Sequence, residues 1–246
     1  MRIEVLFTPA VPASVRLAGG TAVVVDALRA SATIVEALAA GATEVVPVAE
    51  VAEALALAGP GVVVGGERGA QRCDGFDLGN SPREYTPAAV AGRRVVLCTT
   101  NGTRAIEAAH RQGAATLLVA AFSNLKAVVG VAAAAGRDVT VVCAGREGEF
   151  SLEDAALAGG LVAGLAYRLG PAAERTDAAL AAEALFRMHR ADLVRLFASA
   201  AHGRALIDLG FGEDLAVCAR LNTRTVVPAL AAAEGGRPVL RPYPAP

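Results

Sequence analysis

Short Val-rich runs alternate along the chain with longer Ala-rich stretches. The short runs predict strands, and the longer stretches have the length and composition of helices. The predicted strands span residues 2–7, 21–26, 44–48, 62–65, 94–98, 116–121, 138–143 and 225–227. The predicted helices span residues 31–40, 51–58, 103–112, 125–135, 152–169, 177–199 with a break, 203–209 and 213–220.

Several of the predicted strands are apolar throughout, as in VVVD and TVVCA, instead of alternating between apolar and polar residues. Strands of this kind are buried on both faces of a largely parallel sheet. The alternation of strands and helices therefore predicts an α/β protein with a three-layer α/β/α architecture. No linker divides the chain, so we expect a single domain over residues 1–246, with a Pro-rich tail at 236–246 that frays or docks loosely.

Composition narrows the possible partners. The net charge is -1 and no long basic or acidic run occurs, which argues against nucleic acid and against an anionic membrane surface. No stretch reaches the roughly 18 apolar residues that a membrane span needs, and the N-terminus reads as a strand instead of a signal peptide, so we expect a cytoplasmic protein. Four dispersed cysteines without a CxxC pair predict neither a zinc site nor a disulfide framework.

Polar residues gather where predicted strands end, which is where ligands bind in open α/β sheets. Asp26 and Arg29 follow the second strand, and a carboxylate and a guanidinium in that place favour a site for an ion or an oxyanion. Ser31, two residues later, is explained equally well as a helix cap. Glu67 and Arg68, in a glycine-rich segment after the fourth strand, fit a ligand-binding pair or an exposed ion pair.

The segment Gly75–Pro82 supplies hard oxygen donors from Asp77, Asn80 and Ser81, which suit Mg²⁺ or a phosphate-bound water. A turn that binds nothing is the competing interpretation. Glu153 and Asp154 pose a similar choice, because Ser151 with acids in the first turn is an ordinary helix start.

The loop Thr99–Arg104 leads from a strand into a helix, an arrangement whose backbone N–H groups suit an anion. Cys98 and Arg104 also have the Cys-x5-Arg spacing of a cysteine-dependent phosphatase. A buried cysteine that ends a strand explains Cys98 more simply. Of the three histidines, His202 lies in a helix break from which it could reach a pocket.

Seven motifs follow one another in order along residues 20–228. They are Val25–Ala30, Gly66–Gly69, Gly75–Pro82, Thr99–Thr103, the Ser151–Asp154 run, Ser199–Arg204 and Gly210–Asp214. Together they resemble the 2-phosphosulfolactate phosphatase family. This resemblance implies a Mg²⁺-dependent hydrolase that converts 2-phospho-3-sulfolactate into 3-sulfolactate and phosphate, a step in coenzyme M synthesis. Asn222 stands where an acidic residue is expected.

The resemblance and the chemistry together assign candidate roles. Asp26, Arg29 and Glu153 are the catalytic candidates, with a carboxylate acting as general base or as nucleophile. The candidate Mg²⁺ ligands are Asp26, Glu67, Asp77 and Asp154. The candidate substrate-binding residues are Arg68, Asn80, Ser81, Thr99, Thr100, Asn101, Gly102, Thr103, Arg104 and Ser151.

The expected partner is a small anionic substrate, and a homodimer is left open. Two alternative functions are kept at this point. One is a cysteine-dependent phosphatase centred on Cys98. The other is a non-catalytic protein that holds a small anion.

Overall fold

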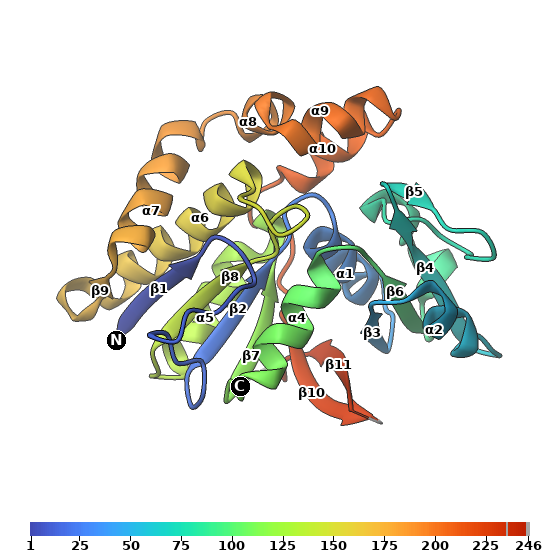
Figure 1. Ribbon diagram of the computed structural model, residues 1–246, viewed down its shortest axis with the longest axis horizontal. Coiled ribbons are helices and arrows are strands. Elements are labelled where there is room, and N and C mark those ends of the chain that lie inside the picture. Colours follow the sequence, from blue (N-terminus) through green and yellow to red (C-terminus); the bar gives the residue numbers. More distant parts are fainter. Residues whose placement is uncertain (235, 245–246) are drawn as a thin grey trace.

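The computed structural model describes residues 1–234 and 236–244, and it arranges one extended sheet between layers of helices (Figure 1). The strands are listed here in their order across the sheet: β5 (Gln71–Arg72), β4 (Val62–Arg68), β6 (Arg94–Cys98), β3 (Glu44–Val48), β11 (Arg237–Pro242), β10 (Pro228–Glu234), β7 (Thr116–Ala120), β2 (Thr21–Val25), β8 (Val139–Cys143), β1 (Arg2–Leu6) and β9 (Glu174–Arg175).

Two parallel blocks make up most of this sheet. Strands β4, β6 and β3 are parallel to one another, and so are β7, β2, β8, β1 and β9. The antiparallel hairpin β10–β11 joins the blocks, with Leu240 opposite Val45 on one side and Ala229 opposite Leu118 on the other. The predicted largely parallel sheet is therefore confirmed, with one antiparallel hairpin at its centre.

The helices connect the strands and cover both faces of the sheet (Figure 1). They are α1 (Ala30–Ala39), α2 (Val51–Ala56), α3 (Pro87–Val90), α4 (Gly102–Arg111), α5 (Leu125–Ala134), α6 (Leu152–Leu169), α7 (Asp177–His189), α8 (Leu193–Ser199), α9 (Ala201–Asp208) and α10 (Gly212–Cys218). The predicted three-layer α/β/α architecture is confirmed.

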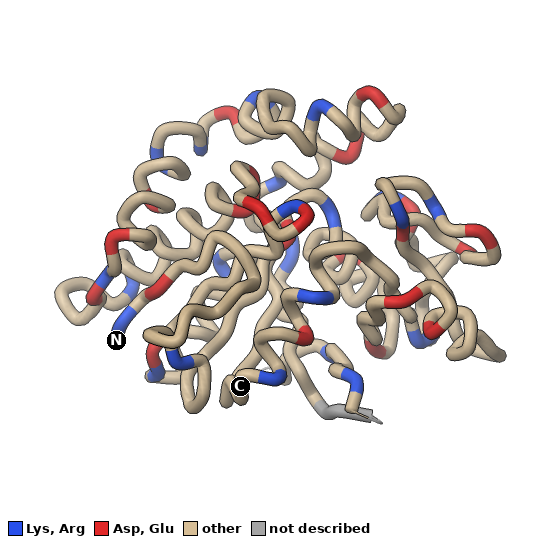
Figure 2. The backbone as a smooth tube through the Cα atoms, in the orientation of Figure 1, with Lys and Arg blue, Asp and Glu red and all other residues tan. Residues whose placement is uncertain are grey.

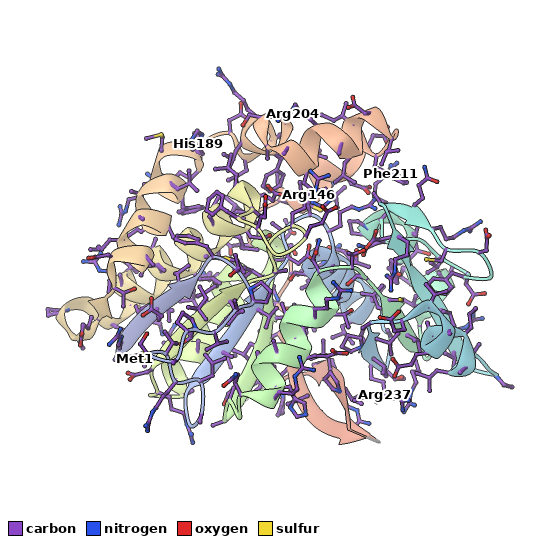
Figure 3. All side chains as sticks on the ribbon, viewed as in Figure 1. Met1, Arg146, His189, Arg204, Phe211 and Arg237 are labelled. Carbon is purple, nitrogen blue, oxygen red and sulfur yellow. The ribbon has the colours of Figure 1, made fainter. Side chains whose placement is uncertain are left out.

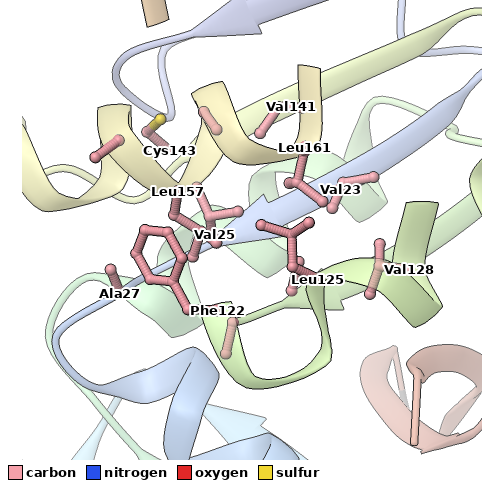
Figure 4. Packing of buried hydrophobic residues seen from close by; sticks show 14 of the residues in the cluster. Val23, Val25, Ala27, Phe122, Leu125, Val128, Val141, Cys143, Leu157 and Leu161 are labelled. Carbon is pink, nitrogen blue, oxygen red and sulfur yellow. The ribbon is translucent and has the colours of Figure 1, made fainter. Parts of the chain in front are cut away.

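Strand β2 shows how the core is divided between the two faces. Val23 and Val25 pack with Phe122, α5 and α6 on one face (Figure 4). Ala22 and Val24 pack with α1 and α4 on the other. That second cluster continues onto β3, β4 and β6, so one continuous apolar layer packs against the strands of both parallel blocks.

The C-terminal segment differs from the prediction. The expected strand at 225–227 begins only at Pro228, and the tail expected to fray forms β11, in which Val239 and Leu240 are fully buried. Two prolines, Pro238 and Pro242, hide this strand in the sequence, although its two apolar residues fill the space between the blocks. Residues 245–246, also part of the predicted tail, lie outside the described residues.

Asn222 has a local structural role. Its backbone has a φ of 55°, a conformation that Asn tolerates better than most residues, and its N–H donates to the Phe122 carbonyl. Its Oδ1 accepts the Lys126 N–H at 2.8 Å, in the first turn of α5. An amide suits this position because it caps a helix.

Within the described parts of the chain, no helix is both long enough and apolar enough to cross a membrane.

Candidate active site

Loops from the carboxyl ends of both parallel blocks meet at one cavity of about 160 Å³. Asp26 follows β2, Glu67 belongs to the end of β4, and Thr99 follows β6. The remaining lining residues are Leu28, Arg29, Gly69, Ala70, Asn80, Thr100, Asn101, Arg146, Glu147, His202, Ala205 and Leu209. Polar turns that are distant in the sequence therefore meet at one cavity, but only some of the candidate residues line it.

Asp26 is buried at the base of this cavity. Its Oδ1 accepts the Ala30 N–H at 3.2 Å, and its own N–H donates to Ser31 Oγ at 2.8 Å, so the first turn of α1 holds it in place. Burial raises the pKa of Asp26 from 3.8 to about 6, and the Glu67 and Glu153 carboxylates add to the rise. The His202 imidazole and the Ala30 bond oppose it. A cation bound beside the Asp26 carboxylate would therefore be stabilised by its charge.

The start of α4 packs directly on Asp26 because position 102 has no side chain. A Cβ at Gly102 would lie 2.8 Å from Asp26 Oδ2 and 2.7 Å from the Ala30 Cβ. Gly102, in the predicted Thr99–Arg104 loop, is therefore needed for the start of α4 to approach Asp26 and Ala30 closely.

Glu67 is held by that same loop. The Thr100 N–H and the Thr100 hydroxyl each donate to Oε1 at 3.0 Å, and the Ala70 N–H donates to Oε2 at 2.8 Å. Gly66 allows this arrangement, since a Cβ there would lie 1.9 Å from the Cys98 carbonyl oxygen. Part of the loop predicted to hold an anion thus holds a carboxylate of the protein itself.

Arg29 is paired with Asp214 instead of being free for a ligand. Its Nη1 donates to Asp214 Oδ2 at 2.7 Å, its Nη2 donates to the Ala70 carbonyl at 2.9 Å, and its guanidinium lies 4.5 Å from the centre of the Phe211 ring. Asp214 also accepts from Ser81 Oγ at 2.6 Å. This buried network ties α10 to the cavity.

Arg146 and His202 line the cavity with side chains that can carry positive charge, although neither was a candidate site residue. Arg146 lies in the loop after β8, below α9 and α10 in the view of Figure 3, and the neighbouring Glu147 N–H donates to Asn101 Oδ1 at 3.1 Å. His202 comes from α9. His202 stands within the motif Ser199–Arg204 and Arg146 shortly before the Ser151–Asp154 run, but neither sequence pattern by itself indicates which loop reaches the cavity.

The charges around the cavity are predominantly acidic. Asp26, Glu67 and Glu147 line it, against Arg29 and Arg146, and the Arg29 charge is already matched by Asp214. Figure 2 shows acidic and basic positions adjacent on the loop after β8. An anionic ligand would meet net repulsion here unless a cation accompanied it.

Four candidate substrate-binding residues line the cavity, namely Asn80, Thr99, Thr100 and Asn101. Asn80 is buried, and its Oδ1 has no hydrogen-bond partner among the described residues. An orphaned buried acceptor at a cavity wall is a position that a bound cation or donor would satisfy.

The other substrate-binding candidates are occupied elsewhere or point away. Arg68 donates to the carbonyls of Glu67 and Ala49, and Ser81 donates to Asp214. Arg104 is exposed on α4. Thr103 bonds to Thr99, Gly102 packs on Asp26, and Ser151 Oγ accepts the Asp154 N–H as the cap of α6. None of these six residues lines this cavity.

The four carboxylates predicted to ligate Mg²⁺ do not form one cluster. Asp77 is exposed outside the cavity and accepts the Val64 N–H at 2.9 Å. Both oxygens of buried Asp154 accept backbone N–H groups, from Ala27 at 2.7 Å and Gly145 at 2.9 Å, and burial raises its pKa. No group of three or more His, Cys, Asp or Glu side chains within the described residues could hold a metal. The prediction is therefore wrong as a four-residue set, while Asp26 and Glu67 share the cavity.

Cys98 does not support a thiol mechanism. It is fully buried, does not line the cavity, and packs with its Sγ 3.7 Å from the Ala49 carbonyl oxygen. Burial raises its pKa, which keeps the thiol protonated at neutral pH. The cysteine-dependent alternative is not favoured.

The fold and this cavity define an α/β protein with a polar site at the carboxyl ends of its strands. A family model described as 2-phosphosulpholactate phosphatase matches residues 7–233, and the chain belongs to that family. The family is one of phosphatases, so the protein is an enzyme of the phosphoric monoester hydrolase class.

Relatives span nearly the whole chain. A protein of Symbiobacterium thermophilum is 41% identical over 224 residues, covering 89% of this chain and 94% of the relative. One from Thermotoga petrophila is 40% identical over 228 residues, covering 93% and 95%. One from Gloeobacter violaceus is 42% identical over 218 residues, covering 86% and 89%. Each is named a probable 2-phosphosulfolactate phosphatase.

Proposed function

We propose that this protein hydrolyses 2-phospho-3-sulfolactate, or a closely related phosphorylated 2-hydroxy acid, to the free hydroxy acid and phosphate with the help of Mg²⁺. The observation that carries the proposal is the shared cavity of Asp26, Glu67, Asn80 and Arg146 in a member of this phosphatase family. The place of the reaction in coenzyme M synthesis stays a prediction.

The acidic lining supports a requirement for a cation. The substrate carries a phosphate, a carboxylate and a sulfonate, and it would enter a cavity whose free charges are mostly negative. Mg²⁺ is commonly held by one or two protein carboxylates together with substrate phosphate and water, so a cluster of three ligands is not needed. Asp26 and Glu67 would hold it, with Asn80 Oδ1 as a neutral donor. When bound, Mg²⁺ polarises the phosphoryl group and lowers the pKa of a coordinated water.

The protein's own cationic groups would bind the rest of the substrate. Arg146 lines the cavity, and the structure gives its guanidinium no ion-pair partner among the described residues, so it is available for a sulfonate or carboxylate. Arg29 contributes by holding Asp214 and the main chain at Ala70, and thereby the shape of the cavity.

Phosphate release from 2-phospho-3-sulfolactate tests the proposal. We expect turnover with Mg²⁺, loss of turnover with a chelator, and recovery when Mg²⁺ is returned. Phospholactate, which lacks the sulfonate, should have a higher KM, because Arg146 has one anion fewer to contact. Turnover that ignores chelation would contradict the cation requirement, and absence of phosphate release from both esters would contradict the proposed substrate class.

A further inference from the structure

His202 and Glu153 form a pair that the fold brings together from distant parts of the chain. His202 lies in the first turn of α9, and its Nδ1 is 3.4 Å from Oε1 of Glu153 in the first turn of α6. The Glu153 side chain is 3% exposed and the His202 side chain 23%. Among the ion pairs of the described residues, this imidazole is the one partner of Glu153. A carboxylate this deeply buried requires such a partner.

His202 also forms the wall between two cavities. It lines the cavity of Asp26 and a neighbouring cavity of about 220 Å³, which Ser151, Glu153 and Ser199 also line.

 Arg146 lines both of these cavities as well. The imidazole therefore has Glu153 on one side and the space in front of Asp26 on the other. Its charge lowers the pKa of Asp26, as expected of a cation facing that carboxylate.

The backbone fixes where this imidazole lies. The turn from α8 to α9 brings position 203 onto the Phe197 carbonyl, and a Cβ there would lie 1.8 Å from that oxygen. Only glycine fits this approach. Gly203 therefore seats the first turn of α9 tightly on α8, and His202 is presented to the cavity from a rigid support.

The pairing also determines which nitrogen faces the substrate. An ionised carboxylate only accepts hydrogen bonds, so we expect the Nδ1 that faces Glu153 at 3.4 Å to carry a proton. Nε2 is then the nitrogen available to the cavity. A carboxylate that orients an imidazole in this way is the usual arrangement for proton transfer by histidine.

We propose that His202 is the general acid of the reaction and that Glu153 is its positioning residue. This inference rests on the proposed function. The phosphorus–oxygen bond to the 2-hydroxy acid breaks, and its electron pair goes to the ester oxygen, which takes the proton from Nε2. The oxygen of a water molecule becomes part of the phosphate, and a proton from that water returns through solvent to the imidazole. An alkoxide is a poor leaving group, so this proton transfer lowers the barrier.

Leaving-group dependence tests the role of His202. In His202→Asn, kcat for 2-phospho-3-sulfolactate should fall by roughly 10²- to 10⁴-fold, the range for loss of a general acid. Hydrolysis of 4-nitrophenyl phosphate should fall by less than about tenfold, because nitrophenolate leaves without a proton. His189→Asn, at the far end of α7 (Figure 3), is the matched control and should leave both rates unchanged. Equal losses on the two esters in His202→Asn would overturn the proposal.

Glu153→Gln separates positioning from folding. We expect kcat for the alkyl ester to fall with little change in KM, and the aryl ester to be spared again. Nitrogen NMR of the three histidines supplies a readout that needs no turnover: Nδ1 of His202 should be protonated in the wild type, and this preference should weaken in Glu153→Gln. A bare Nδ1 in the wild type would overturn the inference while leaving the phosphatase activity standing. A wild type that hydrolyses neither ester would instead overturn the proposed function, and the inference with it.

Discussion

Replacement of Asp26 by Asn is expected to lower kcat for 2-phospho-3-sulfolactate by roughly 10³-fold or more, because several kcal/mol of charge stabilisation in the transition state depend on the cation that Asp26 would hold. The isosteric amide can still accept the Ala30 N–H, so the fold should persist. Initial rates of phosphate release at saturating Mg²⁺ measure this effect.

The same variant should be more stable than the wild type when no cation is bound. Asp26 has a pKa of about 6 in the folded chain against an ordinary 3.8, so the folded state binds the proton more tightly. The stability that this proton contributes is complete below about pH 4 and is lost as the pH rises through 6. Asp26→Asn removes that loss, and we expect its free energy of unfolding to exceed the wild-type value by about 1 to 3 kcal/mol at pH 7.5, with no difference near pH 3.5.

Asp77→Asn is the matched control for both measurements. Asp77 was predicted from the sequence as a cation ligand, but it is exposed outside the cavity, and its amide can still accept the Val64 N–H. We expect wild-type turnover and an unchanged pH dependence of unfolding. A loss of turnover in Asp77→Asn equal to that in Asp26→Asn would show that the cavity has been assigned to the wrong residues.

Asp214→Ala is expected to lower the free energy of unfolding by about 3 to 5 kcal/mol. Asp214 and Arg29 are 1% and 2% exposed, and removing the carboxylate leaves a buried guanidinium with no counterion. Ser81 loses its acceptor at the same time. Urea-induced unfolding, followed by circular dichroism, measures the change.

The neighbouring Glu213→Ala is its control. Glu213 pairs with Arg83 at the surface, where the two side chains are 74% and 51% exposed, and such pairs contribute about 0 to 1 kcal/mol. The two substitutions change the charge of α10 equally, so a difference between them reports burial alone. Equal, small effects would mean that the Arg29–Asp214 pair does not hold α10 to the cavity.

The strands and most helices were predictable because their apolar runs are continuous and end at Gly or polar residues. Strands β3 and β6 and helix α6 have the predicted bounds, Glu44–Val48, Arg94–Cys98 and Leu152–Leu169. The hairpin β10–β11 was missed because prolines argue against strands locally, whereas its burial is decided by two blocks that are distant in sequence. Local patterns carry no information about such tertiary pairing.

The site was predictable only in part for a similar reason. Motif order brought Asp26, Glu67 and Thr99–Asn101 to the same strand ends. It did not show which polar side chains are already hydrogen-bonded within the protein. Asp154 accepts two backbone N–H groups, and Arg29 is paired with Asp214. The order of the motifs also did not show that α9 lies beside the cavity. That position of α9 is what makes His202 a lining residue. These outcomes depend on three-dimensional neighbours that spacing does not encode.

Crystals grown with Mn²⁺ in place of Mg²⁺ and with phosphate would test the central claim most directly, since Mn²⁺ has an anomalous signal and takes similar oxygen ligands. We predict one anomalous peak bonded to the carboxylates of Asp26 and Glu67, with phosphate on its open side. Phosphate bound in this cavity without Mn²⁺, or an anomalous peak at Asp77 instead, would contradict the claim that the acidic cavity binds its anionic ester through a divalent cation.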